Sequence, residues 1–239
     1  MLEESFAAAE PAIAAHLACI EQHAHALESL GNEPPPAPRW TQDWFPRLDA
    51  AAAYAMVRRF RPRRIVEVGS GHSTRFLARA AADGATGTRI TAIDPAPRAT
   101  LAGLDIELLR VRVQDSGDAP FAHLAEGDFL VIDSSHKMAP GSDVELLIDR
   151  ILPGLPAGLH VHFHDIFLPD DYPRAWAWRR YTEQGAVAAL VSGADYRIGF
   201  ASAWVVSRRA ELLRTGVLRR LPLVPGAIES SLWLRKVRV

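Results

Sequence analysis

Short β-branched runs alternate with helical segments through most of the chain. We expect strands over residues 64–68, 89–93, 107–113, 128–132 and 159–163, with helices in the gaps between them. Such alternation is typical of a parallel sheet, because each parallel crossover needs a connection long enough to hold a helix. The pattern therefore predicts an α/β, doubly wound fold, and no other feature constrains the chain as much.

The two ends of the chain depart from this alternation. Larger apolar residues recur at three-, four- and seven-residue steps over residues 3–30, which predicts one amphipathic helix. The stretch E-P-P-P-A-P-R that follows is expected to be an extended linker, since proline lacks the amide donor that a helix needs. Residues 196–206 and 231–237 are strand-like, and their proline-broken connection suits an antiparallel closing pair. We therefore separate residues 1–39, a cap or oligomerisation segment, from a domain over residues 40–239.

Composition excludes several classes of protein. The 27 Lys and Arg against 28 Asp and Glu give a formal net charge of -1, which argues against a general nucleic-acid binder. The single cysteine, Cys19, excludes a disulfide framework and a multi-cysteine metal site. No apolar run approaches the roughly 18 to 20 residues that span a bilayer, so we expect a soluble chain with no membrane partner. Acids at the N-terminus, where a secretory signal carries Lys or Arg, make the cytoplasm the expected location.

The first predicted strand runs directly into E-V-G-S-G-H-S-T, residues 67–74. Gly69 and Gly71 let the backbone pass close to a ligand, and the amides at the following helix start offer donors. Thr74 stands where a dinucleotide motif G-x-G-x-x-G has its third glycine. Glu67 would end the strand in the pocket, where its carboxylate can attract a cationic amino group directly or through water. A tight turn without a ligand is the alternative.

Acids also follow the second and third predicted strands. Asp94 ends I-T-A-I-D, where adjacent ribose hydroxyls can donate to its oxygens, and Asp115 can accept from an adenine amine. Each acid could instead be a solvated loop residue or a helix cap. Ligands of open α/β sheets bind at the carboxyl ends of the strands, so the shared position of these acids favours a nucleotide-like ligand.

The motifs E-V-G-S-G-H-S-T, I-T-A-I-D and F-L-V-I-D-S-S-H resemble those of class I S-adenosylmethionine-dependent methyltransferases, over residues 40–239. The resemblance implies a mostly parallel seven-stranded sheet with an antiparallel last strand, as the closing S-S-L-W-L-R-K strand suggests. It also implies that the glycine turn holds the methionine part of the cofactor, the acid after the second strand the ribose, and residues after the third strand the adenine. Ser73 departs from the family pattern, in which many members have a third glycine here. The cofactor-binding residues carried over are Glu67, Gly69, Ser70, Gly71, Asp94, Gln114, Asp115 and Asp133.

Predicted strands four and five end in polar residues that should be neighbours. Asp133 and His136 follow the fourth strand, and His164 and Asp165 the fifth. A metal ion, Mg²⁺ or Mn²⁺, held by Asp133, His164 and Asp165 is one hypothesis. In the metal-dependent branch, similar to catechol-type and macrolide O-methyltransferases, carboxylates stand at these strand ends, and Asp133 and Asp165 match them. The alternative is that Asp133 shapes the pocket while the histidines bind backbone groups.

The expected reaction is displacement of the sulfonium methyl by an acceptor oxygen, with His136, His164 and Asp133 as catalytic residues. His136 is the preferred base, although catechol-type enzymes have a lysine at this spacing. We expect a small-molecule acceptor near the aromatic segment after the fifth strand, and N- or C-methylation stays open. The alternatives are a noncatalytic S-adenosylmethionine-binding protein and an NAD-dependent oxidoreductase. A homodimer through the N-terminal helix is a further hypothesis.

Overall fold

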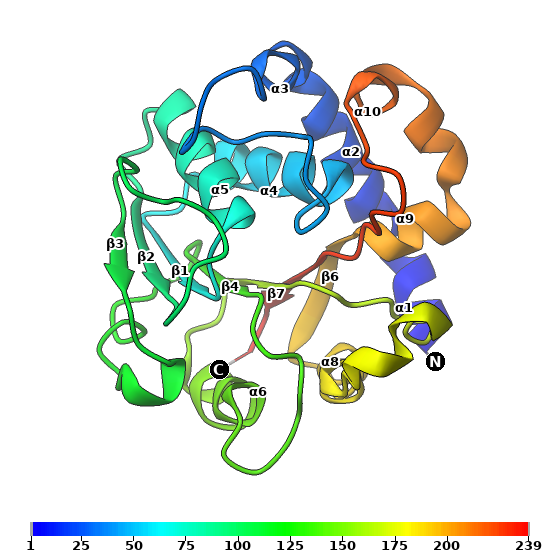
Figure 1. Ribbon diagram of the computed structural model, residues 1–239. Helices are drawn as coiled ribbons and strands as arrows, with labels where there is room; N and C mark the ends of the chain where they lie inside the picture. Colours follow the sequence, from blue (N-terminus) through cyan, green and yellow to red (C-terminus); the bar gives the residue numbers. More distant parts are fainter. Residues whose placement is uncertain (1, 239) are drawn as a thin grey trace.

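The computed structural model describes residues 2–238, which surround one seven-stranded sheet (Figure 1). Its strand order is β3-β2-β1-β4-β5-β7-β6. The first five of these strands are parallel, and β7 is antiparallel to both β5 and β6. The predicted α/β, doubly wound sheet with an antiparallel last strand is confirmed. The strands are β1 Arg64–Val68, β2 Arg89–Ile93, β3 Glu107–Leu109, β4 Phe129–Ile132, β5 His160–Phe163, β6 Tyr196–Ala201 and β7 Leu232–Lys236.

Helices cover both faces of this sheet. In Figure 1, α2, α4 and α5 lie above it, and α6 and α8 lie below it. None of the helices in residues 2–238 is long and apolar enough to cross a membrane. The α-helices after the linker are α4 Arg47–Phe60, α5 His72–Asp83, α6 Asp143–Glu145, α7 Leu152–Gly154, α8 Glu183–Ser192, α9 Ser202–Arg208 and α10 Gly216–Arg220. Short 3-10 helices are η1 Val113–Asp115, η3 Arg174–Arg179 and η4 Ala210–Arg214, and η2 Leu146–Ile151 is a π-helix.

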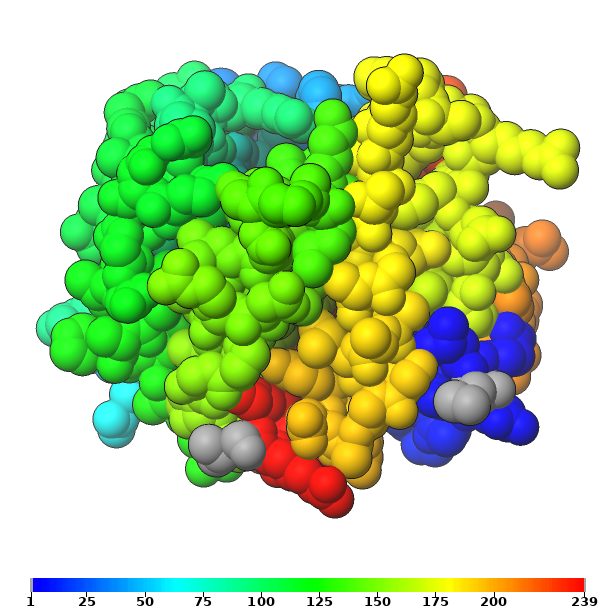
Figure 2. Space-filling view, turned by 90° about the horizontal axis from the view of Figure 1, so that it is seen from below, coloured from blue at the N-terminus to red at the C-terminus, as the bar shows by residue number. Residues whose placement is uncertain are grey.

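The N-terminal segment is not the single helix that its periodicity predicts. It forms α1 Leu2–Ala8, α2 Glu10–Gln22 and α3 Ala24–Ser29. The first break is explained by Pro11, which stands in the first turn of α2 and cannot donate a backbone hydrogen bond to α1. The apolar residues still serve one surface, because α2 packs on α4 and β6, while α1 lies beside α8 (Figure 2).

A second difference from the predicted secondary structure lies near the C-terminus. The strand predicted over 196–206 ends at Ala201, and α9 begins at Ser202. The Ser202 N–H donates to the Ser231 carbonyl as the chain leaves the sheet. Trp204 then turns inward, and its ring stacks on Phe6 with the ring centroids 5.7 Å apart. The helix thus carries this aromatic ring into the core.

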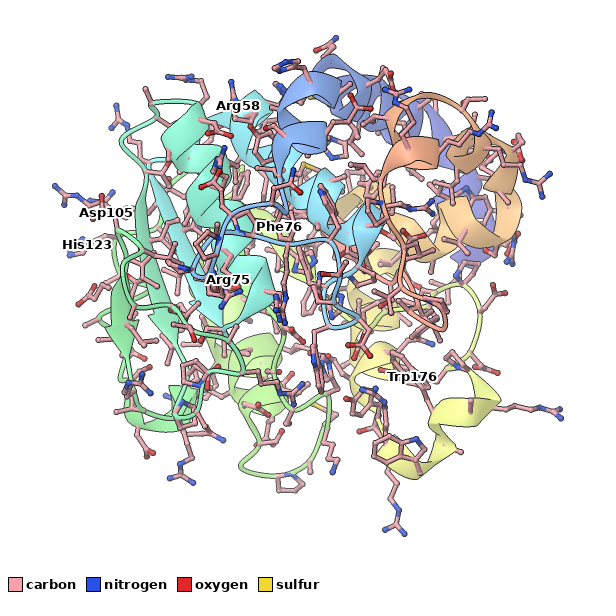
Figure 3. The ribbon with its side chains drawn as sticks, turned by 45° about the horizontal axis from the view of Figure 1, so that its top comes forward. Arg58, Arg75, Phe76, Asp105, His123 and Trp176 are labelled. Carbon is pink, nitrogen blue, oxygen red and sulfur yellow. The ribbon has the colours of Figure 1, made fainter. Side chains whose placement is uncertain are left out.

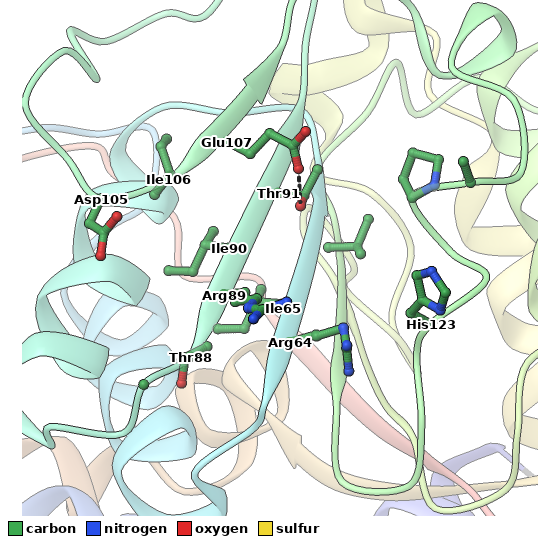
Figure 4. Close-up of a pocket in the computed structure, with 14 residues that line it drawn as sticks. Arg64, Ile65, Thr88, Arg89, Ile90, Thr91, Asp105, Ile106, Glu107 and His123 are labelled. Carbon is green, nitrogen blue, oxygen red and sulfur yellow. Dashed lines mark hydrogen bonds between the residues drawn. The ribbon is translucent and has the colours of Figure 1, made fainter.

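The expected helices between β2 and β3 and between β3 and β4 are absent from the described residues, except for the short η1. Pro95 and Pro97 interrupt the first connection, and Pro120 interrupts the second. The predicted strand 107–113 is also shortened, since β3 ends at Leu109. A polar groove of about 570 Å³ therefore lies over β1, β2 and β3 toward their amino ends (Figure 4).

Candidate active site

The turn after β1 brings the backbone of three strands together. Gly69 has a φ of +82°, and a Cβ at this position would lie 1.9 Å from the backbone oxygen of Asp133. Its N–H donates to the Ile93 carbonyl at the end of β2, at 3.0 Å. Gly71 begins the transition to α5, and its N–H donates to Thr74 Oγ1 at 2.9 Å. The close approach of β4 therefore requires glycine at position 69.

Glu67 lies completely buried beneath this turn. Ser73 Oγ and Thr74 Oγ1 donate to its two carboxyl oxygens, both at 2.5 Å. Burial raises the pKa of Glu67 to about 8 against the effect of these two hydrogen bonds, and the charges of Asp133 and Asp94 raise it further. Glu67 thus holds the first turn of α5 and does not line the adjacent cleft. Its contact with a cofactor amino group stays a prediction.

Asp94 fixes the other side of the turn. Its Oδ2 accepts from the N–H of Ser70 at 2.7 Å and from the Ser70 hydroxyl at 3.0 Å. Its Oδ1 accepts from the Ala96 N–H at 2.7 Å. The side chain is half-buried at the carboxyl end of β2, where the sequence pattern places it.

A cleft of about 670 Å³ opens at the carboxyl ends of β1, β2 and β4. Gln114 lines it, whereas Asp115 is outside the lining and binds Arg112 at 2.7 Å. Of the predicted cofactor residues, the structure brings Gly69, Ser70, Asp94, Gln114 and Asp133 to one cleft. The lining residues are Val68, Gly69, Ser70, Ile93, Asp94, Pro95, Ala96, Arg98, Arg112, Val113, Gln114, Asp133, Ser134, Ser135, Lys137, Ser142 and Asp143.

The four polar residues predicted after β4 and β5 form one cluster. Asp133 Oδ1 lies 3.2 Å from His136 Nε2 and 3.6 Å from His164 Nδ1. Asp165 lies 3.6 Å from His136 Nε2 and 3.4 Å from His164 Nδ1. Both histidines and Asp165 are buried, while 31% of the Asp133 side chain is exposed. Asp133 is thus the member of the cluster that reaches the cleft.

Two buried carboxylates that sequence reasoning missed hold the far sides of the imidazole rings. Glu183 Oε2 lies 2.8 Å from His136 Nδ1, and Asp49 Oδ2 lies 3.2 Å from His164 Nε2. Asp49 also accepts from the N–H groups of Ser230 and Ser231. The sequence carried a signal for Asp49, an acid within the apolar helix R-L-D-A-A-A-A-Y, but none for Glu183.

The carboxylates govern the charge of the cluster. Burial disfavours a charged His136, but bonds and charges of Asp133 and Glu183 outweigh it and hold its pKa well above its usual value. Burial acts in the same way on His164, and Asp165, Asp133 and Asp49 overcome it, so that its pKa is also well above its usual value. Against its own burial, the two imidazoles hold the pKa of Asp133 well below its usual range. Protonated imidazoles therefore neutralise these acids.

The predicted metal ligands Asp133, His164 and Asp165 are close together, but they contact one another as ion pairs. Within residues 2–238, no group of three or more His, Cys, Asp and Glu side chains is arranged to hold a metal ion. These side chains pair with one another as they stand, and we derive no step of the reaction through a metal.

The other two histidines of β5 lie outside this cluster. His160 packs its ring against Phe60 of α4, with the centroids 4.2 Å apart, and His162 Nε2 lies 2.9 Å from Ser231 Oγ. Both side chains are buried. They are packing residues, as their alternation along the strand indicates.

Residues 66–166, from β1 through the end of β5, match the model of a family described as a methyltransferase domain. The chain contains a methyltransferase domain. The matched range includes the glycine turn, the lining of the cleft and all four clustered residues after β4 and β5. No curated protein matches the sequence significantly.

Several solved structures resemble most of the chain. PaMTH1 from Podospora anserina, solved with SAH, is 16% identical and has a TM-score of 0.51, with 91% of this chain and 87% of that chain covered. Cofactor-bound Rv0187 from MTB is 15% identical and has a TM-score of 0.50, with 96% of this chain and 91% of that chain covered. The O-methyltransferase TomG from Streptomyces achromogenes, involved in tomaymycin synthesis, is 17% identical and has a TM-score of 0.48. The match covers 94% of this chain and 90% of that chain. The methyltransferase domain thus has the class I fold of S-adenosylmethionine-dependent enzymes.

Proposed function

We propose that this methyltransferase transfers a methyl group from S-adenosylmethionine to an oxygen of a small molecule. One observation carries the proposal. Asp133 lines the cleft, and its carboxylate also faces His136 and His164 in the buried cluster. A donor in the cleft and an acceptor at the cluster would therefore meet at one residue.

The cleft supplies groups suited to each part of the donor. The methionine part would lie along Gly69 and Ser70, whose backbone forms one wall. Asp94 Oδ1 has one hydrogen-bond partner, Ala96, so a ribose hydroxyl can donate to its remaining lone pair. Gln114 stands on the side expected for adenine, and its position in the lining favours it over Asp115.

The cluster supplies groups suited to a hydroxyl acceptor. In the proposed reaction the acceptor oxygen forms a bond to the methyl carbon while the carbon–sulfur bond breaks, which leaves S-adenosylhomocysteine. His136 can take the hydroxyl proton at Nε2 only after it has released the proton that Asp133 and Glu183 hold on the ring in the resting structure. Glu183 binds the opposite nitrogen of this ring. Alignment of the two reactants supplies the rest of the acceleration. His164, held by Asp49, would orient Asp133 from the other side.

Calorimetry separates the donor hypotheses. We expect S-adenosylmethionine and S-adenosylhomocysteine to bind and NAD to fail, and binding of NAD alone would overturn the proposal. Transfer of labelled methyl to a panel of small hydroxyl compounds then separates an enzyme from a noncatalytic binding protein. Asp133→Asn should lower transfer by roughly a hundredfold. Asp118→Asn, at an exposed position outside the cleft, is the matched control.

Metal assistance by Mg²⁺ or Mn²⁺ stays a prediction with its own test. If Asp133, His164 and Asp165 bind a divalent cation, dialysis against EDTA lowers the rate of transfer and Mn²⁺ restores it. Full activity in the presence of the chelator would remove the metal from the mechanism, while leaving the assignment of donor and acceptor in place.

The homodimer hypothesis also stays open to experiment. In the structure, the buried face of α2 already packs on α4 and β6 of the same chain. A dimer would therefore use the outer face of the N-terminal helices. Light scattering distinguishes a monomer from a homodimer, and a monomer mass would contradict the dimer hypothesis.

A further inference from the structure

The segment between β5 and α8 carries an arginine enclosed by aromatic rings. The Arg179 guanidinium lies over the ring of Trp176 at 4.1 Å from its centroid. Trp178 and Tyr181 follow at 5.3 and 5.4 Å. Figure 3 shows Trp176 on this projecting segment. Cation–π contacts with three rings fix the plane and position of the guanidinium.

The hydrogen bonds of Arg179 leave part of its donor edge unused. One terminal nitrogen donates to the Tyr181 hydroxyl at 2.9 Å. The same nitrogen is 3.8 Å from Asp165 Oδ2, beyond hydrogen-bond distance. The Nε atom is buried and has no partner. An arginine whose role was to pair with Asp165 would instead direct two N–H groups at that carboxylate.

Arg179 stands directly beside the buried cluster. Asp165 Oδ2 lies 3.8 Å from the guanidinium and 3.6 Å from His136 Nε2. Tyr181, whose hydroxyl accepts the arginine hydrogen bond, has its ring centroid 4.5 Å from that of His136. A group bound to Arg179 would therefore lie one side chain away from the proposed acceptor oxygen.

We propose that Arg179 binds an anionic group of the methyl acceptor, a carboxylate or a phosphate, through the terminal N–H groups of its guanidinium. The inference rests on the proposed methyl transfer and names the class of acceptor, a planar hydroxyl compound that carries an acid. The guanidinium fork matches both kinds of anion, and its aromatic cage holds it ready without a rearrangement. Trp178, with 75% of its surface exposed, offers a ring on which the planar part of the acceptor stacks.

Calorimetry on the protein saturated with S-adenosylhomocysteine tests this subsite with small probes. Benzoate and phenyl phosphate supply the two anions, and benzamide is the neutral counterpart of benzoate. We expect at least one anion to bind roughly tenfold more tightly than benzamide, and the stronger anion identifies the class. Equal binding of benzoate, phenyl phosphate and benzamide, or binding of none of them, would overturn the proposal.

Two substitutions make the assignment specific. Arg179→Gln should lower the affinity for the anionic probe by about tenfold and leave the affinity for S-adenosylhomocysteine unchanged. Arg174→Gln changes an exposed arginine of the same segment and should bind the anion as the wild type does. Unchanged anion binding in Arg179→Gln would contradict the proposal. If S-adenosylhomocysteine itself fails to bind, the proposed function fails, and the same probes then report on the subsite in the free protein.

Discussion

Glu183 Oε2 lies 2.8 Å from His136 Nδ1, although 47 residues separate them in the chain. The backbone supports this pair, because the carbonyl of His136 accepts from the N–H groups of Thr182 and Glu183. The start of α8 and the loop after β4 are therefore joined at the residue that we assign as the base. An orienting carboxylate of this kind sets which imidazole nitrogen faces the reactants.

Glu183→Gln tests that relationship. The amide keeps the size of the side chain but loses the charge that supports His136, so we expect kcat to fall by roughly tenfold to a hundredfold. The affinity for S-adenosylmethionine, measured by calorimetry, should not change, because Glu183 does not line the cleft. Glu211→Gln, an exposed acid in η4, is the control for loss of one negative charge. Equal kcat values for the two variants would contradict the role of Glu183.

Gly69 and Gly87 provide a matched pair for the turn after β1. Both have positive φ values, +82° and +66°, but a Cβ at Gly69 meets the Asp133 carbonyl whereas one at Gly87 meets nothing within 4 Å. Gly87→Ala should therefore cost only the strain of its backbone, about 1–2 kcal/mol in urea unfolding. We expect Gly69→Ala to destabilise the fold further and to abolish donor binding. Similar losses in both variants would show that the close contact is unimportant.

Because of Glu67, the free energy of unfolding should decrease as the pH becomes alkaline. The folded protein holds this proton more tightly than the unfolded chain, because the carboxyl pKa rises from 4.5 to about 8. The stability that it contributes is complete below pH 4.5 and is lost as the pH rises through 8. Glu67→Gln cannot ionise, so its free energy of unfolding should fall less than that of the wild type between pH 6 and 9. Parallel curves for the two proteins would refute this.

The sequence predicted the parts of the site that a strand pattern can position. Asp94, Asp133 and Asp165 follow strands whose carboxyl ends meet at one edge, so alternation alone places them together. Glu183 and Asp49 could not be found in this way. Their place depends on how α8 and α4 pack against the sheet, which is a property of the tertiary structure.

Local context also explains the errors in secondary structure. Periodicity over residues 3–30 identified the buried face correctly but gave no weight to Pro11, which separates α1 from α2. The β-branched pattern over 196–206 concealed a helix whose Trp204 has its partner, Phe6, at the opposite end of the chain. In both cases the apolar pattern fixed which side chains are buried, while the backbone path depended on proline chemistry or on a distant contact.

His16 should make the protein sensitive to acid. This ring is buried between α2 and α4, where Nε2 contacts the Ala52 carbonyl, and burial lowers its pKa from 6.5 to about 3. Stability is therefore complete above pH 6.5 and declines as the pH falls toward 3, by about 2 kcal/mol at pH 5 from this group. His16→Gln keeps a donor for Ala52 but cannot take up a proton, so urea unfolding at pH 5 and 7 should show a smaller difference than in the wild type. The exposed His25→Gln should retain the full difference. If His16→Gln retains it as well, the acid sensitivity arises elsewhere.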